Sequence, residues 1–171
     1  LDAFAGHLKA ERAEPSRLFH NAGGARFADV TAAVGLASSA WCGDAVPFDA
    51  NDDGWPDLYV FNMQGKDEYW ENLKGARFVE RSRARFPLTP WGTMGGACLD
   101  VDADGRLDLL LTDMHSDMST VESPEREKRK ADMQWPEALL ATANRSLFGN
   151  ALFRNAGGGR WEEIGDEIGA E

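Results

Sequence analysis

Two short acidic stretches carry the residue types best suited to chemistry. One of them, 100–108, reads DVDADGRLD and places carboxylates at loop positions 1, 3, 5 and 9, with Gly105 at position 6. Alternating acids in a loop can direct their oxygens toward one point, and glycine permits the sharp turn that closes the loop. A hard cation that takes about six to eight oxygen ligands, Ca²⁺ above all, fits this arrangement.

The same pattern occurs once more, 51 residues earlier in the chain. Residues 49–57 read DANDDGWPD, with Asp or Asn at the same four positions and Gly54 at position 6. Without a cation, acids gathered this closely would repel one another. Because two copies in register are hard to obtain by chance, we expect a repeated metal loop rather than a solvated acidic turn.

The flanking residues distinguish these loops from an EF-hand, which needs a glutamate at position 12 and a helix on each side. Position 12 is Val60 in one copy and Leu111 in the other, and the last acid stands at position 9 instead. The runs 58–61 and 107–111 are short and mostly apolar, which is typical of buried strands. Pro56 would also obstruct an entering helix. Each loop is therefore expected to join two strands.

A second pattern, a hairpin, occurs three times. In each copy a strand-like run ends in Asn, a turn follows, and an aromatic residue six positions after the Asn starts the next strand. The Asn and aromatic pairs are Asn21 and Phe27, Asn72 and Phe78, and Asn155 and Trp161. Hairpin, linker, strand, loop and strand together make four strands in about 51 residues, the spacing of a β-propeller blade or a β-solenoid coil.

The last interval between hairpins is 32 residues longer than the first. The excess lies at 116–148, where Ser123 and Pro124 form a good helix start. We expect a helical insertion there, serving either as a contact surface or as a solvated spacer. Residues 1–16 are rich in Ala and charged residues and are expected to form an N-terminal arm. The predicted organisation is thus an arm at 1–16 and a propeller segment at 17–171.

The composition narrows the classes of partner. The 171 residues carry a formal net charge of −11, and the 18 Lys and Arg residues do not form a basic stripe. This argues against binding to nucleic acid or to anionic membranes. No apolar run approaches the ~20 residues of a membrane span. Cys42 and Cys98 are not equivalent in the repeat, so a disulfide and two free thiols both remain open.

Several of these stretches together match one known kind of repeat. They are the hairpins at 18–27 and 152–161, the loops at 49–57 and 100–108, and the phrases at 91–95 and 112–118. They resemble the FG-GAP/VCBS repeat family, whose members are integrin-like β-propellers with calcium loops in their blades. The nearer resemblance is to the bacterial branch related to cartilage acidic protein, often found with an ASPIC/UnbV domain.

The resemblance implies two Ca²⁺ sites. The side-chain ligands would be Asp49, Asn51, Asp53 and Asp57 in one loop, and Asp100, Asp102, Asp104 and Asp108 in the other. The position-7 carbonyls of Trp55 and Arg106 would complete the two shells. Family propellers have about seven blades, whereas this sequence has roughly two and a half, so we expect it to belong to a larger protein or complex.

The expected fold is all-β: a partial β-propeller of four-stranded antiparallel blades with calcium loops and a small helical insertion. The expected function is a non-enzymatic binding or assembly module, extracellular or periplasmic, with a protein partner or further blades of the same propeller. Millimolar extracellular calcium would suit such loops. The alternative is an enzyme domain with copper or another metal held by Met114, His115 and Met118, since thioethers and imidazole are suitable copper ligands.

Overall fold

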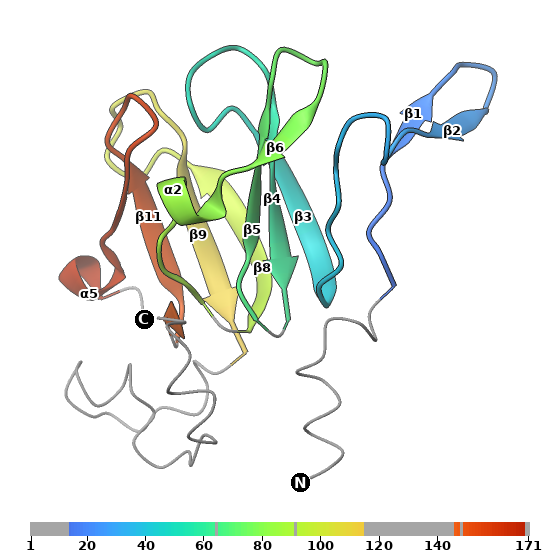
Figure 1. The fold of residues 1–171 in the computed structure, drawn as a ribbon. Helices are drawn as coiled ribbons and strands as arrows, with labels where there is room; N and C mark the ends of the chain where they lie inside the picture. The colour runs from blue at the N-terminus through green and yellow to red at the C-terminus, as the bar shows by residue number, and fades with distance from the viewer. Residues whose placement is uncertain (1–13, 64, 91, 115–145, 148, 170–171) are drawn as a thin grey trace, which may run out of the picture.

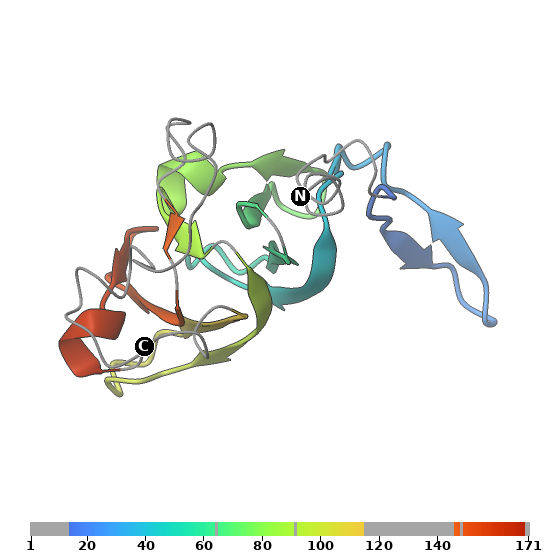
Figure 2. The same cartoon turned by 90° about the horizontal axis from the view of Figure 1, so that it is seen from below.

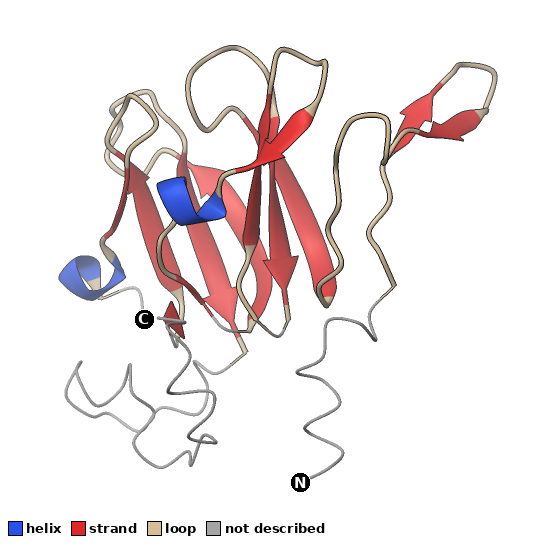
Figure 3. Ribbon diagram, in the orientation of Figure 1, coloured by secondary structure: helices blue, strands red, loops and turns tan. Residues whose placement is uncertain are grey.

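The computed structural model describes residues 14–63, 65–90, 92–114, 146–147 and 149–169. These residues form two four-stranded antiparallel sheets and two pairings of two strands each (Figures 1 and 3). The expected all-β, propeller-like fold is confirmed. No described helix is long and apolar enough to cross a lipid bilayer.

The first sheet has the strand order β3-β4-β5-β6. Its strands are β3 (Cys42–Phe48), β4 (Asp57–Asn62), β5 (Glu68–Asn72) and β6 (Phe78–Glu80). The acidic loop at 49–56 joins β3 to β4. On its other edge β4 pairs with β5, and β5 and β6 form a hairpin. A metal loop and the hairpin that follows it therefore share one sheet.

The second sheet repeats this arrangement with the order β8-β9-β11-β12. Its strands are β8 (Thr93–Leu99), β9 (Asp108–Asp113), β11 (Ala151–Asn155) and β12 (Trp161–Glu163). The predicted insertion at 116–148 falls between β9 and β11, and all of it but 146 and 147 lies outside the described residues. These two residues form β10 (Ser146–Leu147), which pairs in parallel with β7 (Thr89–Pro90).

The first hairpin stands apart from both sheets. It consists of β1 (Phe19–Asn21) and β2 (Phe27–Asp29), which pair only with each other among the described strands. Figures 1 and 2 show it projecting away from the two sheets. The predicted arm at 1–16 lies outside the described residues except for its last three.

The main core fills the space between the two sheets. Phe86 is at its centre, with its ring centroid 5.0 Å from that of Tyr59, 5.4 Å from Tyr69 and 5.3 Å from Phe153, each contact edge-on. Aromatic rings prefer this geometry, and their burial is a large favourable contribution to folding. The linker between β6 and β7 thus supplies the residue that joins the sheets.

Two short helices follow the hairpins, α2 (Ser82–Arg85) and α5 (Gly165–Ile168). They begin at the same position of the repeat, three residues after Val79 and Glu162 respectively. Four residues are too few to show a helical period in the sequence, so neither helix was expected. From α2, Arg85 Nη1 donates to the carbonyl of Gly159 at 2.9 Å and so links the two sheets.

The two cysteines are free thiols in the structure. Cys42 is exposed at the start of β3, and Cys98 is partly buried in β8. Burial raises the pKa of the Cys98 thiol to about 11, so it stays protonated at neutral pH.

Candidate metal centre

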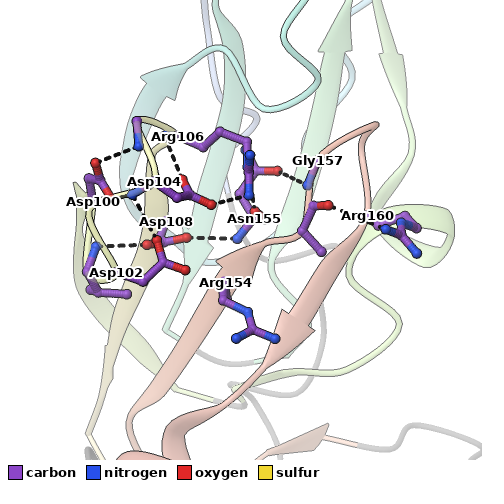
Figure 4. A network of polar contacts seen from close by, with 12 residues as sticks. Asp100, Asp102, Asp104, Arg106, Asp108, Arg154, Asn155, Gly157 and Arg160 are labelled. Carbon is purple, nitrogen blue, oxygen red and sulfur yellow. Dashed lines mark hydrogen bonds and ion pairs between the residues drawn. The ribbon is translucent and has the colours of Figure 1, made fainter.

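The second acidic loop is folded around its own carboxylates (Figure 4). Asp100 accepts hydrogen bonds from the backbone N–H groups of Asp104 at 3.0 Å and Gly105 at 2.9 Å, one on each carboxylate oxygen. Asp102 Oδ1 accepts a second bond from Asp104 N at 3.2 Å. These contacts curl the backbone around the carboxylates of Asp100 and Asp102.

The first loop makes the same bonds. Asp49 accepts from the N–H groups of Asp53 at 3.1 Å and Gly54 at 2.7 Å, and Asn51 Oδ1 accepts from Asp53 N at 3.1 Å. The position-7 residues also match: Trp55 N and Arg106 N donate to the position-5 carboxylates at 2.9 and 2.8 Å. The sequence repeat is therefore a repeat of conformation.

The φ angles of the two loops agree at positions 4 and 6. Position 4 has a positive φ in both loops, +62° at Asp52 and +59° at Ala103. The glycine at position 6 has φ of +86° in Gly54 and +88° in Gly105, a region that residues with a Cβ rarely adopt. The glycine spacing noted in the sequence is therefore required by the turn itself.

The acid at position 9 of each loop is buried and ties the loop to the next hairpin. Asp57 is 0% exposed and Asp108 is 1% exposed. Asp57 Oδ1 accepts from Asn72 N at 2.7 Å, and Asp108 Oδ1 accepts from Asn155 N at 2.8 Å. The Asn that ends each hairpin strand was visible in the sequence, but its partner 15 or 47 residues away was not.

Burial makes the charge on the position-9 acid of the first loop costly. Loss of hydration raises the pKa of Asp57, although hydrogen bonds from Asn72 N, the Tyr69 hydroxyl and Ala50 N act to lower it. A divalent cation beside this carboxylate would stabilise its ionised form.

In the second loop, oxygens of Asp100, Asp102 and Asp108 lie within 4.8 Å of one another. The donor set consists of carboxylate oxygens, which suit Ca²⁺. Each carboxylate has about four lone-pair sites, so those that accept an N–H bond retain capacity for a metal. The loop therefore fits a calcium ion.

The two loops differ at position 7. In the second, the guanidinium of Arg106 forms an ion pair with Asp104 Oδ2, and its Nε donates to the carbonyl of Asn155 at 2.9 Å. In the first, position 7 is Trp55, which is half-exposed and lies against Gly75 in the neighbouring hairpin. At the four side-chain ligand positions, the second loop has four acids beside a local positive charge, whereas the first has three acids and an amide.

The same segment also matches a known family. Residues 49–111 match the FG-GAP-like repeat, a span that begins at the first acidic loop and includes all of the second. Repeats of this family are generally extracellular interaction modules. A comparison with curated proteins found no match.

The alternative metal site is described only in part. Met114 follows β9, is partly exposed, and donates its backbone N–H to the carbonyl of Gly92 at 2.9 Å. His115 and Met118 lie outside the described residues. The copper hypothesis therefore gains no support from the structure.

Sequence reasoning missed a buried acid in the connection between β4 and β5. Asp67 is 1% exposed and accepts hydrogen bonds from Asn62 N at 2.8 Å and from two hydroxyls, Thr93 at 2.6 Å and Tyr59 at 3.2 Å. Because Thr93 belongs to β8, this carboxyl joins the two sheets. A single Asp with partners up to 26 residues away leaves no short-range pattern in a sequence.

This buried acid predicts a pH dependence of stability. Loss of hydration raises the pKa of Asp67 to about 7, with a smaller contribution from the charge of Asp113. The folded state then binds more protons than the unfolded state between about pH 4 and pH 7, so stability falls as pH rises through this window. Between about pH 4 and pH 7 we expect the free energy of unfolding, measured with urea, to fall by on the order of 4 kcal/mol.

The matched variant for this prediction is Asp67→Asn, which cannot titrate. The difference in unfolding free energy between wild type and variant should change across the same pH window at constant calcium. Parallel pH profiles for the two proteins would show that Asp67 is ionised in the folded state and that the prediction is wrong.

Proposed function

We propose that this chain is a calcium-binding β-propeller segment that acts as an extracytoplasmic binding or assembly module. The observation that carries the proposal is the pair of acidic loops with matching positive φ angles and the same hydrogen bonds to their position-1 carboxylates, with Asp100, Asp102 and Asp108 converging in the second loop. The FG-GAP-like match over both loops supports it.

Each ion would be held by the side chains at positions 1, 3, 5 and 9. These are Asp49, Asn51, Asp53 and Asp57 in the first loop, and Asp100, Asp102, Asp104 and Asp108 in the second. The carbonyls of Trp55 and Arg106 would provide the position-7 ligands. In the second loop, the ion pair between Arg106 and Asp104 would have to loosen for Asp104 to serve.

The proposed role of the metal is structural. The position-9 acid already accepts a backbone N–H from the next hairpin, so a cation on the same carboxylate would hold loop, inner strands and hairpin together. Metal binding would then contribute directly to the free energy of folding. Two Ca²⁺ would also bring the formal net charge from −11 to about −7.

Calcium stoichiometry tests the proposal. Calorimetric titration of the calcium-free chain should give two calcium sites. Asp100→Ala should leave one site, because both carboxylate oxygens of Asp100 accept the backbone N–H bonds that shape the second loop. Asp52→Asn is the matched control, since it removes one acid from the first loop outside the proposed ligands and Asn tolerates a positive φ. Binding of no calcium by the folded wild type would refute the proposal.

A further inference from the structure

One cavity of the structure lies away from the acidic loops. It has a volume of about 260 Å³ and is lined by two segments, the connection between β4 and β5 and the stretch from the end of β6 through α2 to β7. The acidic loop of this sheet precedes β4 and the connection follows it, so the loop and the cavity are at opposite ends of the strand. Pockets for drug-sized ligands have volumes of about 300–1,000 Å³, so this cavity suits a smaller molecule.

Hydrogen bonds hold the two lining segments together. Asp67 N donates to Thr89 Oγ1 at 3.2 Å, and Tyr69 N donates to Ser82 Oγ at 2.7 Å. Asp67 and Thr89 are both buried. The two carboxyl oxygens of Asp67 already accept bonds within the protein, so this acid shapes the cavity and is not available to a ligand. The cavity is therefore fixed by the fold of the first sheet.

Two hydroxyls of the lining are available as donors. Ser82 and Thr89 each accept a backbone N–H, but among the described residues neither hydroxyl has an acceptor for its own hydrogen. A hydroxyl can accept and donate at the same time, so each retains a donor for a ligand. A ligand carboxylate is a strong acceptor for such donors.

Four charged side chains of both signs line the same cavity without pairing. In the part of the chain that the structure describes, the side chains of Lys66 and Arg83 have no hydrogen bond and no ion pair. Glu68 and Glu80 each use one carboxylate oxygen to accept an N–H bond, at 2.9 and 2.8 Å respectively. The second oxygen of each glutamate is free for a ligand.

These charges favour a ligand that carries both signs. Two positive and two negative side chains sum to zero, so an ion of one sign would be attracted by one pair and repelled by the other. A zwitterion can place its negative group near the cations and its positive group near the carboxylates. Charge-assisted hydrogen bonds of this kind are stronger than neutral ones.

We propose that this cavity binds a small zwitterion of the α-amino acid class. Lys66 and Arg83 would hold the ligand carboxylate, with the two free hydroxyls as further donors. Glu68 and Glu80 would accept from the ligand ammonium group. An apolar ligand side chain would contact Phe86 and Pro87, which also line the cavity. This site goes beyond the calcium and assembly roles proposed above and depends on neither.

The test is calorimetric titration of the full chain, in calcium throughout, with L-leucine, L-serine and glycine. We expect saturable 1:1 binding, tightest for L-leucine, and changes in the amide NMR signals of Ser82 and Arg83. Two matched compounds each lack one charge of L-leucine: its methyl ester has no carboxylate, and 4-methylpentanoate has no ammonium group. Each should bind at least about tenfold more weakly than L-leucine, because hydrogen bonds to a charged group are lost.

Two variants remove one charge of each sign from the cavity. Arg83→Gln and Glu80→Gln should each weaken L-leucine binding at least about tenfold. Glutamine at position 80 keeps an oxygen for the N–H of Ser82, so the local fold is retained. The matched controls are Arg77→Gln and Glu167→Gln, which change exposed residues outside the cavity and should leave binding unchanged.

Binding of none of the three amino acids would overturn the inference, as would equal affinities of the Arg83→Gln and Arg77→Gln variants for L-leucine. Equal binding of L-leucine and 4-methylpentanoate would overturn it in favour of a simple anion site, and equal binding of the methyl ester in favour of a cation site. Calcium titration of Arg83→Gln should still give two sites, so failure of the cavity and failure of the calcium loops are distinguishable.

Discussion

Asp57→Ala is expected to lower the free energy of unfolding by about 4–6 kcal/mol even in chelator, because about 1–3 kcal/mol is lost for each buried donor left without an acceptor. Asp57 accepts from Ala50 N at 3.2 Å, from the Tyr69 hydroxyl at 2.6 Å and from Asn72 N at 2.7 Å. A typical domain is stable by only about 5–15 kcal/mol. Urea unfolding in chelator measures this loss apart from any metal.

Asp108→Ala is the natural comparison. Asp108 accepts from Val101 N at 2.9 Å and Asn155 N at 2.8 Å, and the repeat position of Tyr69 is Leu152, which has no hydroxyl. The loss should therefore be smaller than for Asp57→Ala by about 1–3 kcal/mol, the cost of one buried donor left without an acceptor. Equal losses, or wild-type stability for Asp57→Ala, would show that these hydrogen bonds do not secure the loops.

Calcium is expected to raise the melting temperature by roughly 10–20 °C relative to chelator. At a free concentration about a hundred times Kd, each site adds about 2.7 kcal/mol, and two sites add about 5 kcal/mol. In a chain of this size, 1 kcal/mol corresponds to about 2–4 °C. Thermal unfolding followed by circular dichroism, in free calcium at about a hundred times the Kd found by titration, measures the shift.

Magnesium at the same concentration is the matched control. It requires a smaller, nearly octahedral shell and gives up water reluctantly, so its shift should be much smaller. Asp100→Ala should reduce the calcium shift by about half, because one of two sites is lost. A calcium shift below about 2 °C, less than 1 kcal/mol of added stability, would contradict a structural role for the metal.

The sequence alone was sufficient for the loops and for the strands around them. The turn in each loop needs glycine at position 6, so the glycine is a visible signal of the turn in the sequence. Gly54 and Gly105 have the same φ within a few degrees. Strands such as β4 and β9 are short apolar runs, so their place next to each loop could be predicted too. The loops and the strands beside them depend on residues close together in the chain, and the sequence contains the pattern twice, so both could be predicted.

The sequence also showed the three hairpins, but not which strands they join. Hydrogen bonds between strand edges connect residues far apart in the chain, such as Asp108 and Asn155, and a one-dimensional pattern does not contain that pairing. Only the tertiary structure decided that each loop shares a sheet with the hairpin after it.

The same reason applies to Phe86 at the centre of the core, to Asp67 between the sheets, and to β1–β2. Each depends on which surfaces meet after folding rather than on local periodicity. The three hairpins read alike in sequence, yet Phe19 is half-exposed while Trp70 and Phe153 are buried. What the sequence determined was the kind of unit, and what the structure decided was how those units are paired.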